Sequence, residues 1–185
     1  MYFSSVSKKT IKDNLQRVES ILESVNSGDS RKELALFIKQ KNLQVINLLD
    51  IFNRETKARV RFTWLLGDIG EIAPELITSA VKELFSIYKE TNITGFDRTM
   101  AKVFWQIGIP EPIEGEVIDL LFNWVMCPDK KVAVKVYSIS ALLNVCKKYP
   151  DLKQELRVVI NDQLDKNSIA FKVRARDVLK ELGSL

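Results

Sequence analysis

Residues 55–61 read Glu-Thr-Lys-Ala-Arg-Val-Arg, and three later segments superpose on this heptapeptide. They are Phe-Asp-Arg-Thr-Met-Ala-Lys at 96–102, Asp-Lys-Lys-Val-Ala-Val-Lys at 129–135 and Ser-Ile-Ala-Phe-Lys-Val-Arg at 168–174. Each segment ends in a small or branched apolar residue followed by a base, and apolar residues follow downstream. The bases recur at intervals of about 33 to 41 residues, a period typical of helical-hairpin repeats.

Helical periodicity extends over almost the whole chain. The first stripe consists of Ile11, Leu15, Val18, Leu22 and Val25, spaced as one face of an amphipathic helix. Ser30 and Glu33 have the spacing of a capping box, and we expect one or two short helices after them, with a kink near Asn42. Further helices are predicted at 56–67, 74–91, 96–108, 113–127, 129–148, 151–166 and 168–182. The short turns between them predict antiparallel neighbours.

An acidic residue followed by a Val-Arg or Val-Lys pair resembles the second helix of a HEAT or armadillo-like repeat. Glu55 with Val60-Arg61 and Asp129 with Val134-Lys135 are the closest matches, whereas the segment from Asp97 to Lys102 departs from the pattern at Ala101. The resemblance implies an all-α solenoid of about four antiparallel hairpins at 30–70, 72–108, 111–149 and 151–185. Residues 1–29 would supply an N-terminal capping helix, and residues 1–185 would form a single domain.

The same resemblance implies a structural role for the repeated charges. In HEAT-like stacks, acids and bases form a ladder between neighbouring repeats. Such ion-pair networks are common without a functional role. The predicted ladder consists of Glu55, Arg61, Asp97, Lys102, Asp129, Lys135 and Arg174.

Composition argues against most kinds of catalytic site. The 185-residue chain has no histidine, so no histidine-dependent triad or metal site can be built from it. Its two cysteines, Cys127 and Cys146, have apolar neighbours and are expected to be core thiols, too few for structural zinc. No Gly-Lys-Ser/Thr phosphate loop occurs. We therefore expect no catalytic residue, no metal and no cofactor.

The acidic residues at 111–119 give the weak enzyme alternative. Glu111, Glu114, Glu116 and Asp119 are a possible acid–base group, but they surround a predicted helix N-terminus, where the helix dipole favours acids. The apolar stretches are too short for a membrane span, and the N-terminus lacks a signal-like apolar core. We expect a cytoplasmic protein that is not an enzyme.

Two tryptophans suggest a binding surface. Trp64 and Trp105 each lie three residues beyond a repeat base, so a base and an indole share one helical face. Such a face could stack nucleic-acid bases or hold a cationic ligand. We favour the interpretation that both are core fillers, as is Trp124, because large aromatic residues at helical spacing usually are.

Positive charge gathers near the C-terminal end. Residues 129–185 contain twelve basic and seven acidic side chains, whereas residues 91–128 contain two and five. The main expectation is a non-catalytic binding or scaffold module that recognises a protein or peptide on a concave face lined by the second helices. The alternative is nucleic-acid binding, as in helical-repeat DNA glycosylases of the alkylation-repair type. The candidate partner surface is Trp64, Trp105, Lys130, Lys131, Lys147, Lys148 and Arg176.

Overall fold

A computed structural model describes residues 8–24 and 27–184. The predicted all-α class is confirmed, since helices alone make up the regular structure of these residues. Val25 of the first apolar stripe and Leu185 at the end of the last hairpin lie outside them. The chain forms two compact units, Met1–Phe96 and Asp97–Leu185, and each is described by itself.

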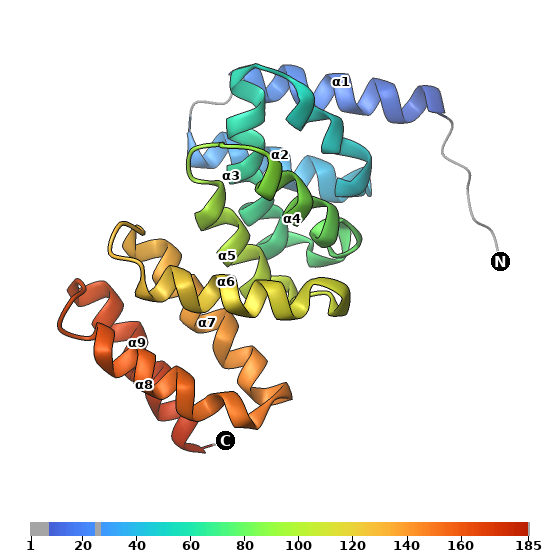
Figure 1. Cartoon of the computed structure of the whole chain (residues 1–185). Helices are drawn as coiled ribbons and strands as arrows, with labels where there is room; N and C mark the ends of the chain where they lie inside the picture. Colours follow the sequence, from blue (N-terminus) through green and yellow to red (C-terminus); the bar gives the residue numbers. More distant parts are fainter. Residues whose placement is uncertain (1–7, 25–26, 185) are drawn as a thin grey trace. The chain divides into compact units, whose positions relative to one another are not determined.

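The N-terminal unit begins with two helices, coloured in blues in Figure 1: α1 (Lys8–Ser24) and α2 (Gly28–Gln40). The prediction of a capping box at Ser30 was wrong, because Ser27 is the N-cap of α2 and its hydroxyl accepts a hydrogen bond from the Ser30 amide. The break expected near Asn42 is present, since α2 ends at Gln40 and Asn42 has a φ of 49°. Asparagine tolerates this left-handed conformation better than most residues.

Short 3-10 helices join the longer helices of this unit. The 3-10 helix η1 (Val45–Asn53) precedes α3 (Lys57–Ile72), and η2 (Pro74–Leu76) and η3 (Thr78–Ala80) precede α4 (Val81–Glu90). The predicted helix at 56–67 was too short, because Gly67 and Gly70 lie inside α3 and are buried. Burial of neighbouring apolar side chains such as Leu66 and Ile69 outweighs the roughly 1 kcal/mol that a glycine costs in a helix.

The core of the N-terminal unit is aromatic. Phe52 of η1 lies against Phe62 of α3, with ring centroids 5.3 Å apart, and against Phe96, at 5.2 Å. Arg31 of α2 forms an ion pair with Asp68 of α3, and the Asp68 side chain is only 9% exposed. The hairpin of α2 and α3 is therefore held by a buried charge pair as well as by apolar contacts.

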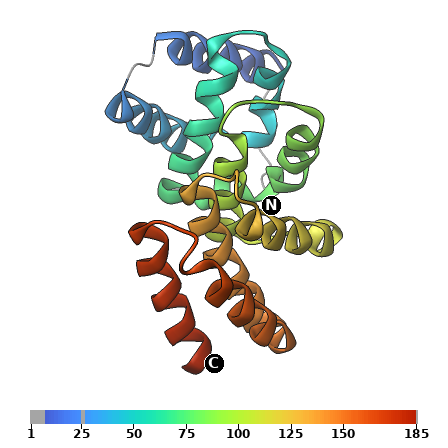
Figure 2. The same cartoon turned by 60° about the vertical axis from the view of Figure 1, so that its left-hand side comes forward.

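The C-terminal unit contains α5 (Phe96–Ile107), α6 (Glu114–Met126), α7 (Val132–Lys148), α8 (Lys153–Gln163) and α9 (Ile169–Ser184). The 3-10 turns η4 (Glu111–Ile113) and η5 (Pro150–Leu152) precede α6 and α8. Helix α7 packs against α6 on one side and α9 on the other, as Figures 1 and 2 show. Gly108, with a φ of 94°, directly follows α5 and allows the chain to turn.

None of the helices in the described residues is long and apolar enough to cross a membrane.

Candidate partner-binding site

The two tryptophans beside the repeat bases are on the surface. Trp64 is 48% exposed and Trp105 is 37% exposed, so the interpretation of both as core fillers was wrong. Trp124 is buried at 3%, as expected. On α5, Arg98, Lys102 and Trp105 are spaced so that they share one helical face, which the neighbouring helices leave partly open.

Trp105 forms a stack with an aromatic residue of the next repeat. Its ring centroid is 5.7 Å from that of Tyr137 on α7, and the two ring planes differ by 22°. About two turns after Tyr137 on α7, Asn144 donates a hydrogen bond from Nδ2 to the main-chain oxygen of Trp105 at 3.2 Å. The indole therefore has a fixed platform on α7 while part of its surface stays open.

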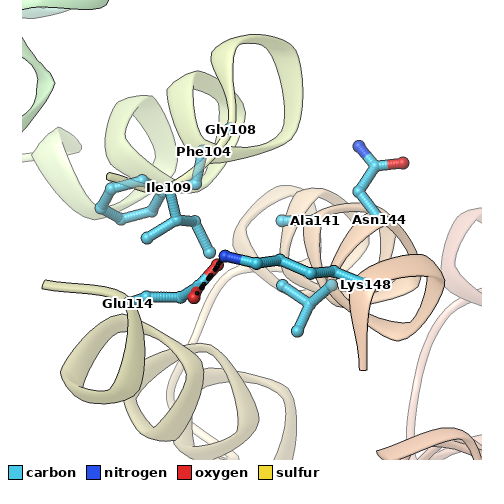
Figure 3. Close-up of a pocket in the computed structure, with 8 residues that line it drawn as sticks. Phe104, Gly108, Ile109, Glu114, Ala141, Asn144 and Lys148 are labelled. Atoms are coloured by element: carbon cyan, nitrogen blue, oxygen red, sulfur yellow. Dashed lines mark hydrogen bonds and ion pairs between the residues drawn. The ribbon is translucent and has the colours of Figure 1, made fainter. Parts of the chain in front are cut away.

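A pocket of about 220 Å³ is lined by Asn144, which bonds to the main chain of Trp105, and by other residues of α7 and the end of α5 (Figure 3). Apolar side chains from the end of α5 and from α7 line its interior, and polar side chains stand at its rim. The interior residues are Phe104, Ile109, Ala141 and Val145, with Gly108 beside them; the rim residues are Glu114, Asn144 and Lys148. The arrangement suits one apolar side chain of a partner.

An ion pair spans the pocket rim. Lys148 Nζ lies 2.9 Å from Glu114 Oε2 and 3.1 Å from Oε1, and Figure 3 shows the lysine reaching from α7 to the start of α6. Tyr149 donates its hydroxyl to Glu114 Oε2 at 2.6 Å. This hydrogen bond, with Lys148, lowers the pKa of Glu114, and the bond to Glu114 raises the pKa of Lys148. Both groups are therefore charged at neutral pH, and the positive charge of Lys148 is compensated within the chain.

The other basic residues of the candidate partner surface divide into two groups. Lys130 forms an ion pair with Asp97 at 2.9 Å and lies 5.6 Å from the centroid of the Trp124 ring. Lys131, Lys147 and Arg176 are exposed, and none of the three has a side-chain ion pair within the described residues. Only part of the predicted basic surface is thus open to a partner.

Three of the predicted ladder bases bind acceptors outside that ladder. Arg61 donates to the main-chain oxygens of Leu22 and Glu23 at 2.8 and 2.6 Å, at the C-terminal end of α1, where carbonyls lack helical partners. Lys135 is buried and donates to Gln163 Oε1 at 3.3 Å. Arg174 donates from Nε to Ser140 Oγ at 2.9 Å.

The predicted ladder acids have different surroundings. Asp97 forms its ion pair with Lys130, and Glu55 and Asp129 are exposed. Lys102 is part-buried on the open face of α5. The repeat bases are therefore structural contacts between helices, but their acceptors are mainly carbonyl, amide and hydroxyl oxygens.

Replacing Arg174 with alanine is expected to lower the free energy of unfolding by about 1.5 kcal/mol. The change removes the hydrogen bond to Ser140 on α7 and a 3.9 Å contact with Glu181. Arg176→Ala is the matched control, because Arg176 is exposed on another side of α9. Urea unfolding followed by circular dichroism measures both; equal stabilities of the two variants would contradict the assignment.

The cysteines differ in their surroundings. Cys146 is buried, as predicted, and burial raises the pKa of its thiol. Cys127 is only half-buried, so its assignment to the core was wrong, because α6 ends just before it at Met126. Over residues 8–24 and 27–184, no group of three or more Cys, Asp or Glu side chains is arranged to hold a metal ion.

Sequence reasoning missed much of this site. Tyr137 and Asn144 drew no attention because neither belongs to a repeat base or a charged run. Glu114 was predicted to be an acid at a helix N-terminus, with acid–base chemistry as the weaker alternative, and not a partner of Lys148. The repeat period could have indicated these pairs, because residues about one repeat apart lie on neighbouring repeats. Glu114 and Lys148 are separated by 34 residues, and Trp105 and Asn144 by 39.

The model of the HEAT repeat domain matches residues 18–182, which is most of the chain. No curated protein and no solved structure gives a significant match.

Proposed function

The chain belongs to the HEAT repeat family, and from that premise we propose that it is a non-catalytic binding module for a protein or peptide. HEAT repeats are helical scaffolds that typically mediate protein interactions. Within the C-terminal unit, we place the contact on the open face of the second helices α5 and α7. The partner binds across the Trp105–Tyr137 stack and the adjoining pocket.

The observation that carries this proposal is the partly exposed indole of Trp105 beside an apolar pocket. Tryptophan and tyrosine are enriched among the residues that dominate interface energetics. An indole stacked on Tyr137 loses little further freedom when a partner covers it, and Asn144 fixes the main chain that carries it. This surface needs no catalytic group to act.

Nucleic-acid binding is the second candidate, and the charge pairing weakens it. Affinity for phosphates comes from cations that release counterions on binding. Lys130 and Lys148 already have carboxylate partners, Asp97 and Glu114, so two of the predicted phosphate contacts are compensated. The remaining open cations do not form a continuous stripe in the sequence.

Capture from native lysate with the tagged full chain tests the proposal. We expect a protein partner that survives nuclease treatment and that binds Trp105→Ala about tenfold more weakly than the parent. The control is Met126→Ala, which removes an exposed apolar side chain (44%) from the first helix α6 and should leave the affinity unchanged.

Three results would go against the proposal. A partner that disappears with nuclease would favour the nucleic-acid candidate. Equal weakening by Trp105→Ala and Met126→Ala would mean non-specific apolar adhesion. Capture of no protein at all would leave the module without the proposed ligand.

A further inference from the structure

Resting on the proposed function, we infer that the segment bound at α5 and α7 is a linear peptide with one large apolar residue flanked by acidic residues. The inference combines the pocket, the amide at its rim and the distribution of charge between first and second helices.

The pocket sets the size of the apolar residue. An apolar cavity of about 150 Å³ is large enough to hold benzene. The pocket beside Trp105 has about 220 Å³ and an interior of Phe104, Ile109, Ala141 and Val145. Its volume is sufficient for one leucine, methionine or phenylalanine side chain as an anchor.

The rim favours an extended main chain. Asn144 lies between the pocket and the aromatic stack, and its Nδ2 already donates to Trp105. Its Oδ1 accepts no hydrogen bond within the described part of the chain, so an acceptor and the second amide hydrogen remain. An extended peptide offers one N–H and one C=O per residue, which matches this pair.

Charge is divided between the two sets of helices in this unit. The second helices α5, α7 and α9 contain nine bases and three acids, whereas the first helices α6 and α8 contain two bases and five acids. Lys135 is buried, and Lys148 and Lys172 have carboxylate partners, so only some of these bases can meet a ligand. Arg98 on α5 and Lys147 on α7 are exposed, and an acidic ligand complements them.

Two cations next to the site are open. Arg98 lies two turns before Trp105 on α5, and Lys147 lies one turn beyond Asn144 on α7; both are exposed. Neither has a side-chain ion pair within the described residues. The nearby acids Asp97 and Glu114 are paired with Lys130 and Lys148. Glu111 is 87% exposed and its carboxylate lies 3.9 Å from Lys148 Nζ, so an acidic peptide is expected to bind on the side of Arg98 and Lys147, away from Glu111.

Selection from a display library of random short peptides on the immobilised full chain tests the inference. We expect enriched peptides with Leu, Ile, Met or Phe next to Asp or Glu. A selected peptide, labelled with fluorescein, should bind the double variant Arg98→Glu/Lys147→Glu about tenfold or more weakly. Lys82→Glu is the charge control, because Lys82 is an exposed lysine of α4 in the other unit, and it should change the affinity by less than about twofold.

The pocket is tested separately. Ala141→Phe places a ring into the pocket and should weaken the same peptide about tenfold or more. Because this change could also unfold the unit, methyl NMR of the unmodified protein provides a second measurement, in which the Ala141 and Ile109 signals should shift on peptide addition.

The outcomes distinguish this inference from the proposed function. Enriched peptides that are basic, that lack a large apolar residue, or that ignore the charge reversal would overturn the inference and leave a peptide-binding module. Capture of a protein from lysate without enrichment of any peptide would overturn the inference that the ligand is a linear segment. Failure of both capture and selection would overturn the proposed function itself. Tighter, charge-reversal-sensitive binding of oligothymidylate would assign the face to nucleic acid and overturn both.

Discussion

Replacing Asp68 with alanine is expected to lower the free energy of unfolding by about 3 kcal/mol. Asp68 lies on α3 with its side chain 9% exposed, and its partner Arg31 on α2 is 24% exposed. Removal of the carboxylate leaves the guanidinium partly buried without its counter-charge, and this uncompensated charge costs more than the lost pair interaction. Urea unfolding of the full chain, followed by far-ultraviolet circular dichroism, measures the loss.

The double variant Arg31→Met/Asp68→Leu separates the two contributions. It removes both charges and keeps apolar volume between α2 and α3, so we expect it to recover most of the stability lost in Asp68→Ala. A loss in Asp68→Ala of less than about 1 kcal/mol, the range of an exposed pair, would show that the Arg31–Asp68 contact is not a buried charge pair.

The helical-repeat architecture was predictable from local signals. The superposed segments at 55–61, 96–102, 129–135 and 168–174 mark α3, α5, α7 and α9, each of which begins in or next to its segment. Apolar spacing is sufficient for this purpose, because every helix must bury one stripe. The same spacing does not distinguish α-helix from 3-10 helix over one or two turns. This is why η1 was predicted only as a short helix, and why η2 and η3 were predicted as the start of one continuous helix at 74–91.

The contacts of the repeat bases were not predictable in the same way. The sequence places Arg61, Lys135 and Arg174 at equivalent positions, and all three do connect neighbouring helices. Their long side chains can reach several acceptors, and tertiary packing selects among them. Arg61 binds carbonyl oxygens at the end of α1, whereas Arg174 binds the hydroxyl of Ser140. The heptapeptide alone predicts neither acceptor.

The candidate site was less predictable from the sequence than the contacts of the repeat bases. Periodicity places Trp105 on a face with Arg98 and Lys102, but it does not tell whether a neighbouring helix covers that face. The stack with Tyr137 and the bond from Asn144 join residues of different repeats. Such juxtapositions depend on the register between repeats, and a degenerate repeat with variable period does not fix that register.

Replacing the buried Lys135 with methionine is expected to raise the free energy of unfolding by about 2 kcal/mol. Lys135 is 3% exposed and donates to Gln163 Oε1, an uncharged acceptor. That oxygen also accepts from Asn167 Nδ2 at 3.1 Å, so it keeps a partner when the lysine is lost. Methionine preserves much of the apolar stem without the cost of burying an ammonium group. Lys147→Met is the control, because Lys147 is exposed on the same helix and its replacement should change stability by less than about 0.5 kcal/mol.

The pH dependence of stability gives a second, independent test of this prediction. Burial is the main cause that lowers the pKa of Lys135 below its ordinary 10.5, and the nearby Lys166 charge adds to it. The unfolded chain therefore binds more protons at this site than the folded chain between the lowered pKa and 10.5, so stability should rise with pH across that window. The rise should be absent from Lys135→Met and retained in Lys147→Met. Two results would contradict an unfavourable burial of Lys135. One is a lower stability of Lys135→Met than of the parent. The other is a parent whose stability does not rise relative to that of Lys135→Met as the pH approaches 10.5.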